Sequence, residues 1–347
     1  MTRPGAVGKR WGEMSHKASI AVVTYNTKHY WAKLRRALDA QTESAFELIV
    51  IDNASDPDKR LSAEHMPQYA RYVQLEENIG FAAANNIAAR QTAAPFFVCL
   101  NPDAFPRPEW LSRLLSVFDQ RPDIAAAGSL QLCDEDPGLI DGAGDCYWAG
   151  GLPYRSLRGR PLPRQFHPGE VFSACAAACA FRRSAFDAVG GFDESFFCYC
   201  EDVDLGFRLR LAGWQIVQAN DAIVHHVGGG SSATQSDFAR YYGARNRIWT
   251  FVKNMPAPLL CALLPAHILL TAFVLLWSLI RGTPSPTWRG VIAAWKGIGK
   301  VVRARAAVQG QRRASTLDIA RHMAWSPIAV MQRRSIRRSA ERSLPFG

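Results

Sequence analysis

Two familiar phosphate-binding motifs are missing from this 347-residue sequence. No G-x-x-x-x-G-K-[ST] segment occurs, which excludes a nucleotide site of the P-loop type. The nearest dinucleotide-type run, GAGDCYW at 142–148, lacks the third glycine and follows no convincing predicted strand. A bound nucleotide would therefore be held by side chains, with or without a metal ion.

Cysteine pairs with the C-x-x-C spacing of a structural zinc site are missing too. The chain has eight cysteines, none of them in a C-x-x-C pair, and Cys198 and Cys200 are separated by a single residue. We therefore expect reduced, buried cysteines in a cytosolic protein. The first 18 residues are polar and basic and contain no apolar core. We expect no signal peptide and a catalytic body that stays in the cytoplasm.

Negative charge is scarce in the C-terminal part of the chain. Residues 281–347 contain 14 lysines and arginines and two acidic residues, whereas the net charge of the whole chain is +11. Just before them, residues 259–280 are nearly all apolar and long enough to span a bilayer. Pro265 and His267 interrupt this run, and a single crossing would put the basic tail outside, against the positive-inside rule. We expect a helix or hairpin that lies in the cytoplasmic leaflet.

Residues 288–302 have the pattern of an amphipathic helix. One face would carry six apolar residues: Trp288, Val291, Ile292, Trp295, Ile298 and Val302. Four basic residues lie largely off this face: Arg289, Lys296, Lys300 and Arg303. The pattern is typical of an interfacial membrane helix, and the alternative is an ordinary core or oligomer helix. With the final basic stretch, QRRSIRRSAERS, it predicts binding to an anionic membrane surface and not to nucleic acid.

Short apolar runs with polar ends alternate with helical segments from residue 18 onward. The runs lie at 19–26, 46–55, 71–81, 96–105 and 124–132. This alternation predicts an α/β fold with a mostly parallel sheet covered by helices on both faces. Residues 134–170, rich in glycine, proline and arginine, are predicted to be loop. Polar strand ends would gather at one sheet edge, where open α/β sheets bind ligands: Asn26, Asp52, Asn78 and Asp103.

An acidic cluster follows an aromatic run in the segment CYCEDVDLGFRLRLAGW at 198–214. Glu201, Asp202 and Asp204 occupy three of four consecutive positions, directly before apolar residues at helical spacing. Acidic residues are favoured in the first turn of a helix, so a purely structural interpretation is available. The segment alone leaves the structural and the functional interpretation open.

A series of short motifs occurs in a fixed order along residues 18–255. They are VVTYN, VIDNAS, ENIGFAAANN, LNPDAF, GGFDESFFCYCEDVDLGFRLRLAGW, HHVGGGSS and YYGARNR. The ordered set resembles the family 2 glycosyltransferases of GT-A fold, and most of all the bacterial rhamnosyltransferases that build polyprenyl-linked surface glycans. The resemblance implies a Rossmann-like GT-A domain over 18–255, between a flexible N-terminus at 1–17 and a helical membrane-associating region at 256–347.

The resemblance implies a nucleotide-sugar pocket at the sheet edge. It assigns seven residues to the donor: Thr24, Asn26, Asp52, Asn78, Gly80, Asn85 and Arg245. Asp52 would accept hydrogen bonds from the base, and Arg245 would hold the diphosphate. The alternatives are a strand-end Asx turn for Asp52, a surface position on a helix for Asn85, and a surface arginine for Arg245.

The resemblance also implies a divalent metal ion, Mn²⁺ or Mg²⁺, that bridges the two donor phosphates. Asp103 occupies the last position of the family's D-x-D motif, and Asn101 stands where many members have aspartate. A plain turn is the alternative role for Asp103. His226 would contact the metal, and His225 is the alternative because adjacent strand residues point to opposite faces.

The acidic cluster takes on a catalytic role in this family. Asp202 is the candidate base that removes the proton of the acceptor hydroxyl, Glu201 is its neighbour or replacement, and Asp204 is a helix-start residue. The implied reaction is an inverting transfer of L-rhamnose from dTDP-L-rhamnose to a polyprenyl-diphosphate-linked saccharide. It would occur on the cytoplasmic face of the inner membrane, by a peripheral or monotopic enzyme. A UDP- or GDP-sugar donor, a sugar nucleotidyltransferase and a non-catalytic membrane scaffold are the alternatives.

Overall fold

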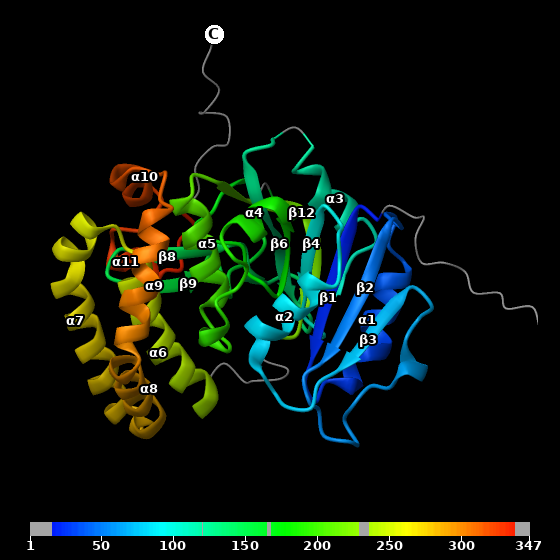
Figure 1. Ribbon diagram of the computed structural model, residues 1–347, viewed down its shortest axis with the longest axis horizontal. Coiled ribbons are helices and arrows are strands. Elements are labelled where there is room, and N and C mark those ends of the chain that lie inside the picture. Colours follow the sequence, from blue (N-terminus) through cyan, green and yellow to red (C-terminus); the bar gives the residue numbers. More distant parts are fainter. Residues whose placement is uncertain (1–15, 120, 165–167, 229–235, 337–347) are drawn as a thin grey trace, which may run out of the picture.

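The computed structural model describes residues 16–119, 121–164, 168–228 and 236–336. The predictions for residues 1–15, for most of the glycine-rich segment at 228–232 and for the end of the basic tail lie outside the described residues. Figure 1 shows the sheet and the helices that cover its faces toward the right, and the C-terminal helices, yellow to red, toward the left.

A ten-stranded sheet forms the centre of the molecule, with the order β10-β12-β6-β11-β4-β1-β2-β3 along its main path. The first half matches the predicted alternation. It consists of β1 (Ala18–Thr24), β2 (Phe46–Asp52), β3 (Ala70–Gln74) and β4 (Phe96–Leu100), which pair in parallel.

The second half of the sheet is mixed. It contains β6 (Ile124–Cys133), β11 (Ala178–Arg182) and β12 (Gln215–His226). The strand β11 lies antiparallel between β4 and β6, while β12 runs parallel to β6. The reason is topological, since β11 enters the sheet after a long excursion that reverses its direction.

Alternating side chains build a core on each face of the sheet. Ile20 and Val22 of β1 point to one face, where they pack with the helices α1 (Lys28–Asp39) and α3 (Trp110–Ser116). Ala21 and Val23 point to the other face, toward α2 (Gly80–Arg90) and α5 (Glu201–Leu211). Two buried faces explain why these strands are continuous apolar runs in the sequence.

The excursion between β6 and β11 contains short strands where the sequence predicted loop. The strand β7 (Ile140–Gly142) pairs with β6, and β8 (Asp145–Trp148) forms a hairpin with β9 (Leu152–Arg155). The strand β10 (Gly169–Glu170) pairs with β12. The loop prediction for 134–170 is therefore wrong in part, because the GAGDCYW run begins at the last residue of β7 and contains β8. These strands are too short and too rich in glycine to show a period.

The C-terminal part is a set of helices packed beside the sheet. They are α6 (Asp237–Asn254), α7 (Ala257–Ile280), α8 (Pro284–Lys296), α9 (Ile298–Gly310), α10 (Thr316–Arg321) and α11 (Pro327–Met331). The helix α4 (Arg183–Ala188) lies earlier in the chain, after β11.

Helix α7 is continuous, with Pro265 inside it. The hairpin alternative for residues 259–280 is therefore wrong. By length and composition alone the helix could cross a membrane, with a mean hydropathy of 2.5 over its most apolar window, of which 6% is buried. Figure 1 shows it along the outer edge of the helical layer.

The predicted single amphipathic helix at 288–302 is wrong. The chain forms two helices, α8 and α9, that meet at Gly297, where a Cβ atom would lie 2.4 Å from the Trp249 ring. Val291 is buried against α6, whereas Trp288, Ile292 and Trp295 of the same predicted face are exposed. Close packing on Trp249 thus breaks the helix and divides its apolar residues between core and surface.

Residues after 256 share a core with residues before it. Ile319 and Met323 pack in one apolar cluster with Tyr147, Phe172 and Phe251. The predicted boundary at 255–256 therefore crosses a packed interior, and the helices α8–α10 form part of the same folded unit. The assignment of 256–347 as a separate membrane-associating region stays a prediction.

Candidate active site

A cavity of about 320 Å³ lies beside the C-terminal end of β4 and the start of α5. Four residues chosen from the sequence line it: Asp103, His226, Glu201 and Asp202. Three residues that sequence reasoning missed line it too: Asp145, Arg155 and Cys175. The fold therefore brings the predicted metal-site and base residues, far apart in the sequence, into one space.

The predicted donor residues lie outside the lining of this cavity. Val23 and Phe81 are in that lining, next in sequence to Thr24 and Gly80, but none of the seven proposed donor residues is. Thr24 donates a hydrogen bond to Asp52 Oδ2 at 3.3 Å, and Asp52 Oδ1 accepts from Ser55 N at 2.9 Å. Asp52 is fully buried, and both of its carboxylate oxygens have partners within the chain.

The loops that follow β1, β2 and β3 are tied together by asparagines. Asn26 Oδ1 accepts a hydrogen bond from Asp56 N at 2.8 Å. Asn78 Oδ1 accepts from Asn53 Nδ2 at 2.8 Å and from Gly80 N at 3.0 Å. The donor residues at this edge therefore stand in a rigid, hydrogen-bonded frame.

The remaining predicted donor residues have partners of another kind. Asn85 is buried and donates to the Phe81 carbonyl of its own helix at 3.0 Å, so the surface alternative does not hold. Arg245 donates to the carbonyls of Ser195 and Phe196 at 2.9 and 2.8 Å. In this structure the Arg245 guanidinium holds a turn of the backbone, at a position that is not part of the cavity lining.

Asp103 and His226 come together through strand pairing. The short strand β5 (Ala104–Pro106) pairs with the end of β12, with Ala104 opposite His226. His226 Nε2 lies 3.4 Å from Asp103 Oδ1. His225 points elsewhere and accepts a hydrogen bond from Arg107 at 3.2 Å, so His226 is the histidine beside Asp103.

A carboxylate that the sequence analysis missed orients His226. Asp141 Oδ2 lies 2.8 Å from His226 Nδ1, and it also accepts from Arg155 Nη1 at 2.6 Å. Burial raises the pKa of Asp141, but His226 and the arginines outweigh it, so the pKa is held well below its usual value. Burial lowers the pKa of His226, but the close Asp103 carboxylate and the hydrogen bond to Asp141 outweigh burial and leave the pKa raised.

The geometry of His226 fits a cation. With Nδ1 bonded to Asp141, the other ring nitrogen, Nε2, is buried and makes no hydrogen bond. An orphaned imidazole nitrogen beside a carboxylate is a suitable ligand pair for a divalent metal ion, and the Asp141 contact has the form of the usual outer partner of a metal-binding histidine.

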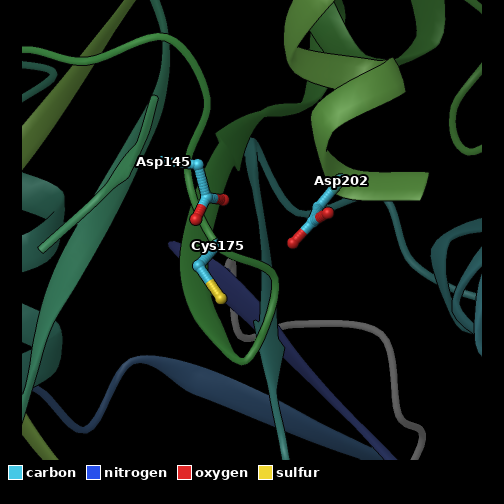
Figure 2. Close-up of side chains that lie close together, drawn as sticks. All are labelled: Asp145, Cys175 and Asp202. Carbon is cyan, nitrogen blue, oxygen red and sulfur yellow. The ribbon is translucent and has the colours of Figure 1, made fainter. Parts of the chain in front are cut away.

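A second group of side chains lies across the cavity. The group consists of Asp145, Cys175 and Asp202. Each offers one potential metal-ligand atom, and these three atoms all lie within 4.8 Å of one another. Figure 2 shows the Asp202 carboxylate turned toward the side on which Asp145 and Cys175 lie. This group could also hold a metal. However, Arg155 donates to Cys175 Sγ at 3.2 Å, and its guanidinium already places a positive charge there.

Burial controls the protonation of the acidic residues in the cavity. It raises the pKa of Asp145 to about 8, with a further contribution from the nearby Asp202 charge. It also raises the pKa of Asp202, although the backbone amides of Ala176 and Val203 stabilise the charged form and limit the rise. Glu201 has a strongly raised pKa from burial, and its Oε2 makes no hydrogen bond. A base with a raised pKa is a better proton acceptor near neutral pH.

Asp204 lies in the first turn of α5, as predicted, but it is not a solvated residue. Its side chain is fully buried and forms ion pairs with Arg208 at 2.8 Å and Lys253 at 2.7 Å. Asn254 Nδ2 donates at 2.7 Å to Asp204 Oδ1, the oxygen that Lys253 also contacts. Asp204 therefore joins α5 to α6 and faces away from the chemistry.

The turn before α5 is conformationally strained. Phe197, Tyr199 and Cys200 all have positive φ, at 66°, 67° and 63°. For residues with a Cβ atom such conformations cost roughly 1–3 kcal/mol each. Gly80 makes room for this turn, because a Cβ atom there would lie 2.6 Å from the Phe197 carbonyl oxygen. The strain lies directly before Glu201 and Asp202.

The missed residues gave weak signals in the sequence. Asp145 is part of the GAGDCYW run, which resembles only an incomplete dinucleotide motif, and Asp141 precedes it. Arg155 lies opposite Asp145 across the β8–β9 hairpin. A hairpin prediction for this run would have paired these two residues.

Comparison with known proteins gives the family of this site. Residues 19–190 match the family described as "Glycosyl transferase family 2". An N-acetylglucosaminyl-diphospho-decaprenol L-rhamnosyltransferase from Mycobacterium tuberculosis is 28% identical over 67% of this chain and 83% of its own length. The O-antigen biosynthesis protein RfbC from Myxococcus xanthus is 30% identical over 69% of this chain, which spans only 20% of that protein.

A solved structure shares the fold. The mannosyltransferase PcManGT from Pyrobaculum calidifontis, in complex with GDP-Man and Mn²⁺, superposes with a TM-score of 0.51 at 16% identity. The match covers 90% of this chain and 89% of that one. The GT-A fold predicted from the motifs is therefore confirmed, and residues 19–190 are a family 2 glycosyltransferase domain in a rhamnosyltransferase-like chain.

Proposed function

We propose that the protein transfers L-rhamnose from dTDP-L-rhamnose to a polyprenyl-diphosphate-linked saccharide, with inversion at the anomeric carbon and with the help of Mn²⁺ or Mg²⁺. One observation carries the proposal: a single cavity holds Asp103 and His226 beside Glu201 and Asp202. The rhamnosyl donor and the lipid-linked acceptor are supported by the name of the relative that covers most of its own length.

The donor would lie along the sheet edge, with its base near Asp52 and its diphosphate near Asp103. Asp103 Oδ1 and the unpartnered His226 Nε2 would hold the metal ion, while Asp141 keeps the imidazole in the required tautomer. When bound, the metal neutralises the charge that develops on the leaving diphosphate. Thr24, Asn26 and Asn78 keep the frame of this edge in place through their hydrogen bonds.

The acceptor would enter from the α5 side. As its hydroxyl oxygen forms the bond to the anomeric carbon, the proton passes to the Asp202 carboxylate and the bond from that carbon to the diphosphate oxygen breaks. Because attack and departure are in line, the anomeric configuration inverts. The Ala176 amide holds the carboxylate at 3.2 Å, and the apolar surroundings limit competition by water.

Membrane binding would bring the enzyme to its lipid-linked acceptor. Helix α7 has a broad exposed apolar surface, and α8 adds Trp288, Ile292 and Trp295. Lys296 and Lys300 follow directly and supply positive charge for anionic headgroups. We propose a peripheral or monotopic position on the cytoplasmic face of the inner membrane, with no role for nucleic acid.

The test is a donor and acceptor panel on the full chain in detergent or vesicles. Transfer of labelled L-rhamnose from dTDP-L-rhamnose to a polyprenyl-diphosphate-linked N-acetylglucosamine, dependent on added Mn²⁺ or Mg²⁺, is the expected result. UDP-N-acetylglucosamine and GDP-mannose serve as competing donors. Faster transfer from either of them would overturn the donor assignment, and full activity in excess chelator would overturn the metal role.

A further inference from the structure

The amide of Asn246 collects three carbonyl groups of one turn. Asn246 lies on α6 and is fully buried. Its Nδ2 donates to the carbonyl oxygens of Phe196 at 2.9 Å, Cys198 at 2.9 Å and Tyr199 at 2.7 Å. An amide has two N–H groups, so at least one of them is shared between two carbonyls. One side chain thus donates hydrogen bonds to three backbone carbonyl groups of a strained turn.

The orientation of this amide is itself fixed. Arg245 Nε donates to Asn246 Oδ1 at 2.8 Å, which directs the Nδ2 end toward the turn. Helix α2 contacts the turn as well, because the Ala82 amide donates to the Phe197 carbonyl at 3.2 Å. Helices α6 and α2 therefore clamp the turn between them.

The turn leads without a break into the acidic pair. Cys200 has positive φ, and its carbonyl accepts from the Asp204 amide at 2.8 Å in the first turn of α5. Glu201 and Asp202 follow Cys200 directly and line the cavity together with Cys198 and Tyr199. A change in the turn backbone must therefore change where the two carboxylates point.

We propose that Asn246 is a positioning residue, which holds the strained 196–200 turn and thereby aims the Glu201–Asp202 pair at the acceptor hydroxyl. This inference rests on the proposed function of that pair. A strained conformation persists only where its surroundings enforce it, and functional sites are where such enforcement is common. Without Asn246, the carbonyls of Phe196, Cys198 and Tyr199 each lose one hydrogen bond, so the turn relaxes and the pair leaves its place.

The experiment compares Asn246→Ser, Asn246→Ala and the control Asn86→Ala in the full chain. Asn86 is also buried; it bonds the backbone of Phe192 and the side chain of Glu194, and it makes no hydrogen bond to residues 196–200. The assay follows two products from labelled dTDP-L-rhamnose: rhamnose transferred to the lipid-linked acceptor and free rhamnose from hydrolysis. Binding of the donor and the folded fraction are measured on the same samples.

The expected result is a fall in transfer of about 10²-fold for Asn246→Ala, the size that a small misplacement of a reacting group can produce. Asn246→Ser should lose less, because its hydroxyl can still donate one bond. Donor affinity should be unchanged, and the ratio of hydrolysis to transfer should rise, since water needs less precise aiming than the acceptor. Asn86→Ala should lose stability with an unchanged ratio.

Two outcomes would overturn the inference. The first is an unchanged ratio of hydrolysis to transfer in the folded Asn246 variants, which would reduce Asn246 to a purely structural residue. The second is an equal rise in the ratio of hydrolysis to transfer in Asn246→Ala and in Asn86→Ala. If the wild-type protein turns over no dTDP-L-rhamnose, the proposed function fails instead, and the inference falls with it.

Discussion

Lys253 is a buried cation between two carboxylates, and replacing it by methionine should destabilise the protein strongly. Its side chain is 3% exposed and lies 2.5 Å from Asp193 and 2.7 Å from Asp204. Asp204 is fully buried, and Asp193 is 26% exposed. Methionine keeps most of the side-chain volume and leaves both carboxylates without this cation.

The magnitude follows from two considerations that agree. Breaking a buried ion pair by removal of one partner typically costs about 3–5 kcal/mol. Burial raises the pKa of Asp193, but Lys253 and two hydrogen bonds from Ser195 outweigh it, and the pKa falls from 3.8 to about 2. At about 1.4 kcal/mol per pKa unit, this lowering corresponds to about 2–3 kcal/mol, to which Lys253 makes the largest favourable contribution.

The loss of stability in Lys253→Met should depend on pH in a definite direction. The pKa of Asp193 is lower in the folded state than in the unfolded state. Its contribution to stability is therefore fully present above about pH 4 and is lost as the pH falls toward about 2. The gap in unfolding free energy between wild type and Lys253→Met should therefore be widest near neutral pH and should narrow toward pH 2.

Urea unfolding at several pH values measures this gap. The control is Arg240→Met on the same helix, which breaks an exposed pair with Asp237 and should cost no more than about 1 kcal/mol. The reasoning is refuted if Lys253→Met costs no more than the control, or if the gap does not change with pH.

Three further outcomes are expected. Asp141→Asn should weaken Mn²⁺ binding about 10–100-fold in calorimetry, because it removes the charge that orients His226. The control Asp136→Asn, at an exposed position, should leave Mn²⁺ binding unchanged. Equal Mn²⁺ affinity in both variants would contradict the metal site. The double variant Ile292→Ser, Trp295→Ser should bind anionic vesicles more weakly without loss of folding, since both side chains are exposed. If this variant binds vesicles as tightly as the wild type, α8 does not contact the membrane. Because the pKa of Asp202 is raised by burial, the transfer rate should fall on the acid side at a pH above the ordinary 3.8 of aspartate, and a rate that stays constant down to that value would speak against Asp202.

The part of the fold that the sequence predicts well is the part where local pattern and long-range packing agree. Strands β1 and β2 are buried on both faces, so their apolar runs are continuous and end at polar residues. The sequence places Asp103 after a predicted strand at the polar edge of the sheet, and the family resemblance adds His226. The family motifs supplied their roles, and the strand pairing brought them together.

The rest depends on contacts that no local pattern encodes. The break at Gly297 comes from the ring of Trp249, 48 positions earlier in the chain. Asp141 and Arg155 lie in short strands without a visible period, and their mutual contact is set by the β6–β11 excursion. Asn246 stands in the YYGARNR motif, but its three carbonyl partners are known only from the fold.

The most direct test of the account is the rate of Asp202→Asn at saturating donor. Asparagine keeps the shape and removes the charge, so folding and donor affinity should survive, while transfer should drop by about 10²–10⁴-fold, the usual contribution of a positioned general base. Glu201→Gln, measured alongside, should cost less. Transfer by Asp202→Asn at a rate near that of the wild type would contradict the account, and the acidic cluster would then be only the charged start of a helix.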